Sequence, residues 1–149
     1  MCCVNLALLA EVRAYLAQAK PDVAAKLARY AKATITDVTA SFTDVAAGDN
    51  IIATKAVSEG EALVLPIIEV GKKTGDISKD KIQIVDETGA SRAVIPLVSN
   101  GERIGENAIK RLDIVLEPVH NYTIKYVAAA AITGANLTVS LQGFRITTV

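Results

Sequence analysis

The spacing of apolar residues changes once along the chain, at Thr34, and this change limits the choice of fold. Before it, apolar residues recur every three or four positions, which places them on one face of a helix. Residues 5–19 and a second segment from Pro21 to about Ala33 are therefore predicted to form a helical arm or hairpin. Beyond Thr34, apolar residues recur at every second position. Residues 36–43 alternate between apolar and polar side chains, which predicts a strand with one buried face.

The rest of the chain is a series of short extended runs separated by turn residues. No segment there has both the length and the period of an amphipathic helix, so crossover helices are lacking and the strands are predicted to be antiparallel. With residues 36–43 the runs number eight, the others being 50–57, 62–70, 81–86, 92–98, 109–117, 122–131 and 136–147.

These patterns give a fold class that is mainly β. The prediction is an N-terminal helical arm or hairpin (residues 1–33) followed by an eight-stranded antiparallel jelly-roll-like β-sandwich (residues 34–149). Another β-sandwich topology or a small barrel would also accommodate eight such strands. Pro66 and Pro96 fall inside predicted strands. Because proline has no N–H group to donate, each of these two strands is predicted to lie at an edge or to contain a bulge.

Charge and composition narrow the classes of function. The chain has 16 Lys and Arg against 16 Asp and Glu, which argues against nucleic-acid binding and against a polybasic membrane surface. Aromatic residues make up only 4% of the chain, too few for a surface that stacks single strands or sugars. The first 33 residues hold five basic and two acidic residues, which we interpret as a solvated helix face in preference to a docking surface for an anionic partner.

Hydrophobicity favours self-association. The mean hydropathy is +0.34. This value indicates more apolar surface than one sandwich core and one helix seam readily bury. The candidate interface residues are apolar or aromatic and lie in two segments. They are Leu9, Val12 and Leu16 on the first predicted helix, and Tyr122 and Tyr126 on one face of a predicted strand. The two tyrosines would serve either as interface anchors or as residues that close the core.

Catalytic and metal-binding patterns are sparse. His120, the single histidine, lies in a predicted turn without a cysteine nearby, so it cannot build the usual zinc site. A catalytic triad would have to reach it through tertiary contacts alone. The nine glycines form no phosphate-binding loop. We therefore expect a protein that is not an enzyme and that has no metal and no cofactor.

The N-terminus gives expectations about the compartment. Cys2 and Cys3 are adjacent and cannot staple a fold, so they are predicted to be reduced thiols. The apolar run that opens the chain has no basic region before it and is interrupted by Glu11, which predicts neither a signal peptide nor a membrane span. Synthesis in a cytoplasm is expected.

A short helical lead, a body of eight strands rich in Val, Ile, Thr and Ala, and a long last strand from Leu137 to Ile146 together resemble a known class. It is that of the small jelly-roll cement or decoration proteins of tailed-phage capsids. The resemblance implies a homo-oligomer, with a trimer favoured and dimers known, seated on the capsid exterior of the virion after synthesis in the host cytoplasm. It implies the major capsid protein as partner, with neighbouring subunits clamped together.

Two other classes of function are weighed against this one. A receptor- or carbohydrate-binding β-sandwich of a fibre or adhesin would need a polar loop cluster with aromatic residues, and only Tyr122 is near a predicted turn. A hydrolase or epimerase on a jelly-roll scaffold would need several histidines or a compact cleft of carboxylates.

Overall fold

The computed structural model describes residues 6–28, 31–77, 79–99, 102–103 and 109–148. The helices are α1 (Leu6–Ala19) and α2 (Pro21–Ala28). The strands are β1 (Ala31–Phe42), β2 (Gly48–Val57), β3 (Glu61–Gly71), β4 (Lys81–Val85), β5 (Ser91–Pro96), β6 (Val98–Ser99), β7 (Glu102–Arg103), β8 (Ile109–Lys110), β9 (Val115–Leu116), β10 (His120–Ala128) and β11 (Leu137–Thr148). Cys2 and Cys3 lie outside the described residues. Within the described part, neither helix has the length and apolar character needed to cross a bilayer.

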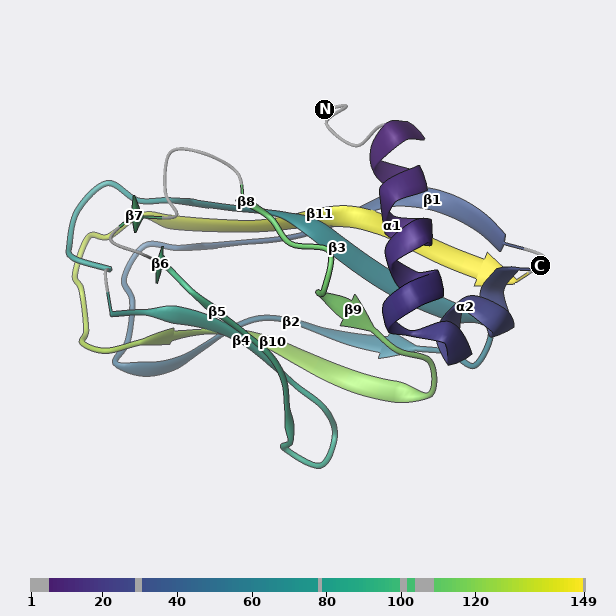
Figure 1. Ribbon diagram of the computed structural model, residues 1–149. Helices are drawn as coiled ribbons and strands as arrows, with labels where there is room; N and C mark the ends of the chain where they lie inside the picture. Colours follow the sequence, from purple (N-terminus) through teal and green to yellow (C-terminus); the bar gives the residue numbers. More distant parts are fainter. Residues whose placement is uncertain (1–5, 29–30, 78, 100–101, 104–108, 149) are drawn as a thin grey trace.

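Two antiparallel sheets face each other (Figure 1). The first has the order β1-β11-β3-β8, with β9 also paired to β3, and the second has the order β2-β10-β4-β5. The residues between β8 and β9 also bond to β3: the Arg111 amide donates to the Pro66 carbonyl oxygen at 2.7 Å, and the Leu65 amide donates to the Ile114 carbonyl oxygen at 3.0 Å. β8 and β9 therefore act as one interrupted strand, and the sandwich has two four-stranded sheets. β6 and β7 form a separate short ribbon.

The strand order is that of a jelly roll. When β8 and β9 count as one strand, the first strand pairs with the eighth, the second with the seventh, the third with the sixth and the fourth with the fifth. Nested pairing of this kind is what results when a long antiparallel ribbon is rolled up. The rolling also places β11 beside β3 and β10 beside β4. The predicted fold class is confirmed, with helices first and eight antiparallel strands after them.

Both proline predictions are confirmed. Pro96 ends β5, which is the edge strand of the second sheet. Pro66 lies inside β3, a strand paired on both sides, and sits at a bulge: Gln142 pairs with Ile67 and Phe144 pairs with Val64, so Gly143 alone lies opposite two residues of β3. Because a bulge leaves its extra residue unpaired, the ladder does not require the N–H group that proline lacks.

The second helix ends earlier than predicted. It stops at Ala28, and the residues from Ala31 belong to β1, although the sequence predicted helix to about Ala33. The reason is tertiary: β1 pairs with β11 from Ala31 opposite Thr148 to Phe42 opposite Leu137, and this continuous ladder outweighs the helix propensity of alanine.

Three strands also differ from their predicted runs. The run 92–98 ends as a strand of the second sheet at Pro96, the run 109–117 is interrupted, and the run 122–131 ends at Ala128. At the last of these, the Ala129 amide leaves the ladder and donates to Asp80 Oδ1 at 2.9 Å, so a side-chain acceptor replaces the next backbone partner.

The residues that the structure describes form two hydrophobic clusters. The larger lies between the sheets. The smaller, here called the helix cluster, lies on the opposite face of the first sheet, where α1 and α2 cover it (Figure 1). Its buried members are Leu8, Val12, Leu16 and Val23 of the helices and Ala62, Val64, Val115, Phe144 and Ile146 of β3, β9 and β11. The helices thus pack on the sandwich of their own chain, and the two clusters bury most of the large apolar side chains that the structure describes.

The bulge at Gly143 gives a test of the fold. A Cβ atom at this position would collide with the Val64 carbonyl oxygen and lie 2.6 Å from Pro66 Cδ. We expect Gly143→Ala to lower the free energy of unfolding by about 3 kcal/mol, as measured by urea denaturation. Gly71→Ala is the matched control, because no atom lies within 4 Å of a Cβ built there. Equal losses in the two variants would contradict the bulge geometry.

The packing of the helical arm gives a second test. Leu16 is 3% exposed in the helix cluster, so Leu16→Ala should lower the free energy of unfolding by about 3 kcal/mol. Gln18→Ala, at an exposed position of the same helix, should have little effect. Because the arm packs on its own chain, the loss should not change with protein concentration. A loss that grows with concentration would mean that the arm docks on a neighbouring copy.

Candidate functional site

The turn between β4 and β5 carries a buried carboxylate. Asp86 is 5% exposed, and its Oδ1 accepts hydrogen bonds from the Thr88 amide at 2.9 Å, the Thr88 hydroxyl at 2.6 Å and the Ala90 amide at 3.1 Å. Its Oδ2 accepts from Arg92 Nε at 2.7 Å. Gly89 completes the turn with a φ of +85°, which glycine adopts without strain. The hydrogen bonds from Thr88 and Arg92 hold the pKa of the Asp86 carboxyl far below its usual range.

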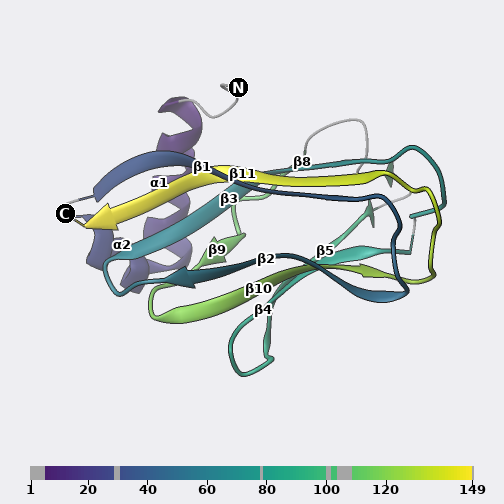
Figure 2. The same ribbon diagram turned by 180° about the vertical axis from the view of Figure 1, so that it is seen from behind.

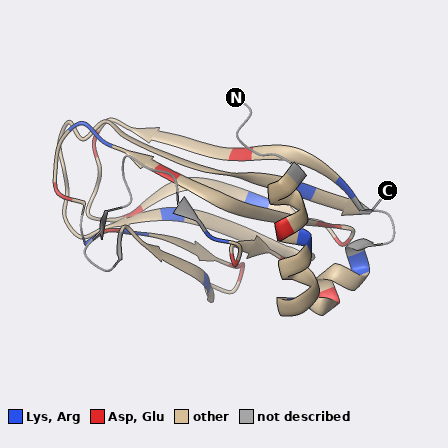
Figure 3. Cartoon of the chain, turned by 45° about the horizontal axis from the view of Figure 1, so that its top comes forward, with Lys and Arg blue, Asp and Glu red and all other residues tan. Residues whose placement is uncertain are grey.

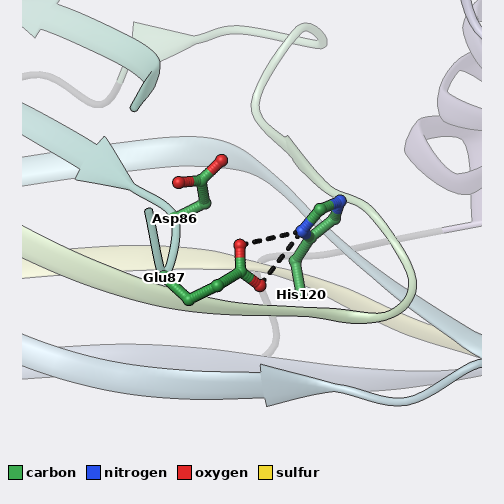
Figure 4. Close-up of side chains that lie close together, drawn as sticks. All are labelled: Asp86, Glu87 and His120. Atoms are coloured by element: carbon green, nitrogen blue, oxygen red, sulfur yellow. Dashed lines mark hydrogen bonds and ion pairs between the residues drawn. The ribbon is translucent and has the colours of Figure 1, made fainter. Parts of the chain in front are cut away.

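The next residue connects this turn to the start of β10. Glu87 Oε1 and Oε2 lie 3.1 and 3.0 Å from Nδ1 of His120, and Glu87 Oε1 also accepts from the Asn121 amide at 3.1 Å (Figure 4). The hydrogen bond with His120 is the main cause that lowers the pKa of Glu87. The arrangement is a carboxylate–imidazole pair at the end of the sandwich where the β4–β5 and β9–β10 turns meet.

A second contact ties this end to the helices. The Tyr122 hydroxyl accepts from the Glu117 amide at 2.8 Å and donates to the Glu117 carbonyl oxygen at 3.3 Å. The Glu117 side chain forms an ion pair of 3.2 Å with Lys20, at the junction of α1 and α2. Burial raises the pKa of the Tyr122 hydroxyl, so it remains a neutral donor and acceptor. These contacts fasten the β9–β10 turn on both sides.

A shallow, open depression lies beside His120. It has a volume of about 600 Å³ and is lined by Ala56, Val57, Ser58, Glu59, Val119, His120 and Asn121. The imidazole–carboxylate pair has the geometry of a base with its orienting acid. A nucleophile is the missing element: among the described residues, no hydroxyl or amine is hydrogen-bonded to His120, and the Ser58 amide donates to Glu61 Oε1 at 3.0 Å.

Asp86, Glu87 and His120 are also the candidate metal ligands. One ligand atom from each of Asp86, Glu87 and His120 lies within 4.8 Å of the others. The chemistry of this set does not favour a cation. Both Asp86 oxygens already accept hydrogen bonds, one of them from the guanidinium of Arg92, which supplies a positive charge where an ion would bind. The hydrogen bonds of the three residues instead close the β4–β5 turn and link it to the β9–β10 turn.

A second buried carboxylate holds the opposite end of the sandwich. Asp80 is 3% exposed; its Oδ2 accepts from the Tyr126 hydroxyl at 2.5 Å and its Oδ1 from the Ala129 amide at 2.9 Å. The Leu97 amide donates to the Asp80 backbone carbonyl oxygen at 3.2 Å. Burial, and then the hydrogen bond to Asp80, raise the pKa of Tyr126. These bonds fix the start of the β10–β11 loop and the end of β5.

The structure places the five candidate interface residues inside the chain. Val12 and Leu16 are buried in the helix cluster and Leu9 is half-buried against it. Tyr122 and Tyr126 are 1% and 0% exposed in the cluster between the sheets, so they close the core. The two groups are not brought together. The charged residues form no single cluster of one sign in the view of Figure 3.

Sequence reasoning missed the buried carboxylates. The predictions from the sequence single out neither Asp80 nor Asp86, and for His120 they indicate only a turn. The signal for Asp86 is in the sequence: an Asp two residues before Thr and three before Gly is typical of a turn closed by its own first side chain. Nothing in the sequence indicates the pairing of Glu87 with His120, because 33 residues separate them.

Comparisons with known proteins are limited to the fold. No protein-family model matches the chain, and no curated protein matches it. The Drosophila NLP core, a structure related to pentamer formation and histone binding, has a TM-score of 0.44 and 16% identity over 76% of this chain and 98% of that chain. The structure of infectious bursal disease virus Gx strain has a TM-score of 0.40 and 10% identity over 80% of this chain.

This chain spans 32% of that viral chain. An antigen and type I fimbria protein of Burkholderia pseudomallei has a TM-score of 0.28 and 18% identity over 78% of this chain and 99% of that chain. At these scores the similarity concerns broad β-sandwich architecture.

The Asp86 turn gives a test with a defined pH dependence. The folded state lowers the Asp86 pKa below its ordinary value of 3.8, so its contribution is fully present above that pH and is lost as the pH falls below it. Asp86→Asn should lower the melting temperature at pH 7, and the difference from the unaltered protein should shrink below about pH 4. Glu59→Gln, an exposed change in the neighbouring turn, is the control. A difference that persists unchanged at pH 2 would refute the assignment.

Proposed function

We propose that this chain is a non-enzymatic structural protein of a virus particle, a cement or decoration protein of the capsid exterior. It associates with copies of itself, as the trimer that the sequence resemblance favours or as a dimer, and clamps neighbouring subunits of the major capsid protein. It needs no cofactor and contacts neither nucleic acid nor a membrane. Binding that requires the assembled shell stabilises the shell by mass action, since each bound copy links subunits that would otherwise separate.

The use of the buried polar groups supports this function. Asp86 and Asp80 hold turns, and Asn50, 8% exposed, accepts from the Ala46 amide and donates to the Ala46, Gly48 and Tyr126 carbonyl oxygens. Asp86, Asp80 and Asn50 are thus committed to fixing loops at the ends of the sandwich, whereas Gln142, a buried residue inside β11, donates only to Ser140 Oγ at 3.2 Å. What the described part of the chain offers to a partner is broad, rigid outer surface, which suits a clamp.

The position of the aromatic residues disfavours the fibre or adhesin alternative. Tyr122, the aromatic residue nearest a turn in the sequence, faces the core with 1% of its surface exposed. Among the described residues that line the depression beside His120, none is Tyr or Phe. A sugar ring would find no stacking surface there.

Native mass and capsid binding together test the proposal. Light scattering coupled to gel filtration should give a multiple of the 15.7 kDa chain. The protein should also co-sediment with capsids assembled from the major capsid protein alone, and it should raise the temperature at which those capsids break up. A monomer that ignores capsids would overturn the proposal, and binding on a glycan array without capsid binding would favour the adhesin alternative.

The non-enzymatic part of the proposal has its own control. His120→Ala removes the one imidazole and its pair with Glu87 and leaves the outer faces of both sheets unchanged. Capsid binding by this variant should equal that of the unaltered protein. A catalytic activity that depended on His120 would contradict the proposal.

A further inference from the structure

β1 is the open edge of the first sheet. It pairs with β11 over its twelve residues without a register shift, and among the described residues no strand pairs with its other side. Figure 2 shows β1 at the margin of the sandwich. An unpaired edge directs alternate backbone N–H and C=O groups outward and acts as a template for another strand.

The other edges carry features that discourage such pairing. β2 has a register shift against β10 and a half-buried lysine, Lys55. β5 has a register shift against β4 and ends at Pro96. β8 and β9 have two residues each, and beside them Arg111 Nη1 donates to the Val94 carbonyl oxygen of β5 at 3.1 Å. Bulges, prolines and short strands protect edges, and β1 has none of them; its one charge on the face of Val38 is Lys32, which is exposed near the start of the strand.

An exposed apolar side chain marks this edge. Ile35 is 51% exposed, one of four large hydrophobic residues exposed in the described part of the chain. Its register partner is Phe144, a buried member of the helix cluster on the same face of the sheet. The apolar surface of the helix cluster therefore continues to the sheet edge and ends there at Ile35.

We propose that β1 pairs antiparallel with β1 of a second copy of this chain about a two-fold axis, with Ile35 opposite Ile35 of that copy. The inference rests on the proposed self-association and names the surface that produces it. It gives a dimer in place of the trimer that the resemblance favours, because an interface of identical strands closes with two copies.

Symmetry limits the register, charge disfavours two of the allowed axes, and Ile35 selects among the rest because it is the exposed large apolar residue of β1. Opposite residues in antiparallel strands point to the same face of the sheet, and a two-fold axis perpendicular to the sheet maps each face onto itself. One residue of β1 must therefore lie directly opposite the same residue of the other copy, with the axis midway between the two. The axis is named below by that residue. An axis at Asp37 would oppose two carboxylates, and an axis at Thr36 would oppose Ile35 to Asp37 twice. An axis at Ile35 pairs residues 31–39 of the two copies and places Asp37 opposite Ala33.

A second copy matches this edge better than an isolated peptide strand. The same axis brings the two β2 edges side by side, because both copies have the same distance between their sheets, about 10 Å. Ile51 of β2 is 53% exposed and lies beside that second seam. A copy therefore covers apolar surface in both layers, whereas a single strand would cover it in one.

Charge reversal at the axis provides the decisive experiment. Ile35→Lys and Ile35→Glu each place like charges opposite one another, so each variant alone should be monomeric, with a dimer Kd raised about tenfold or more. Mixed in equal amounts, the two variants should form a heterodimer, because lysine then faces glutamate. Val94→Lys and Val119→Lys, at other exposed apolar positions, are the controls and should keep the native mass. Sedimentation velocity measures the masses, and circular dichroism checks that each variant is folded.

Cross-linking tests the register. In a background with Cys2→Ser and Cys3→Ser, Ile35→Cys should form a disulfide-linked dimer on mild oxidation, because Cα atoms of opposed residues lie about 4.5–5.5 Å apart. Asp37→Cys and Thr39→Cys should not, since neither faces its own copy.

The outcomes separate this inference from the proposed function. If the protein is a trimer and Ile35→Lys leaves its mass unchanged, β1 pairing is overturned and the capsid proposal still stands. The same conclusion follows if the protein is a monomer that binds capsids. Ile35 variants that stay dimeric, or a mixture that does not associate, would also overturn β1 pairing. A dimer that is disrupted as expected, but whose unaltered form ignores capsids, would support the interface and refute the capsid role.

Discussion

Burial of β3 and β11 on both faces is the constraint on which the rest of the structure depends. In β3 four successive residues from Ala62 to Leu65 are at most 1% exposed, and alternate members belong to the cluster between the sheets and to the helix cluster. An antiparallel sheet can leave one face to water, but a stretch without polar residues cannot. The helical arm supplies the missing cover. Farther along the same strands, Glu69 and Thr138 are exposed, and neither α1 nor α2 covers the end of the sheet away from the chain termini (Figure 1).

This division explains why only four large apolar side chains are exposed in the part of the chain that the structure describes. The sequence argument assigned the apolar residues beyond one sandwich core and one helix seam to contacts with another subunit, and the two clusters of the structure are that core and that seam. The apolar surface that remains is small and is placed at defined points, with Ile35 at the boundary of the helix cluster. A partner surface is therefore to be sought at the margins of the sandwich, where backbone groups and single apolar side chains coincide.

The sequence was informative where local pattern and tertiary pairing agree. The alternation in β1, the turn residues and the two prolines were sufficient to predict eight antiparallel strands and a bulge or edge at Pro66 and Pro96. Prediction failed where long-range contacts decide the outcome. Residues 31–33 are strand because β11 pairs with them, β10 ends where Asp80 accepts the Ala129 amide, and Glu87 meets His120 through the rolling of the ribbon. The tyrosines were correctly placed on one face, but only the packing shows that this face is the core.

The open edge of β1 presents a problem that self-pairing solves. A long strand without a bulge or proline would recruit any extended chain, and unlimited recruitment leads to aggregation. Pairing about a two-fold axis uses β1 of both copies and places their bulged β2 edges side by side, so the edges left exposed are the interrupted β8–β9 and β5 with Pro96. Growth stops at two copies for this reason. A closed, rigid pair of sandwiches presents each of its outer faces twice, and two weak contacts to a repeating shell then act together.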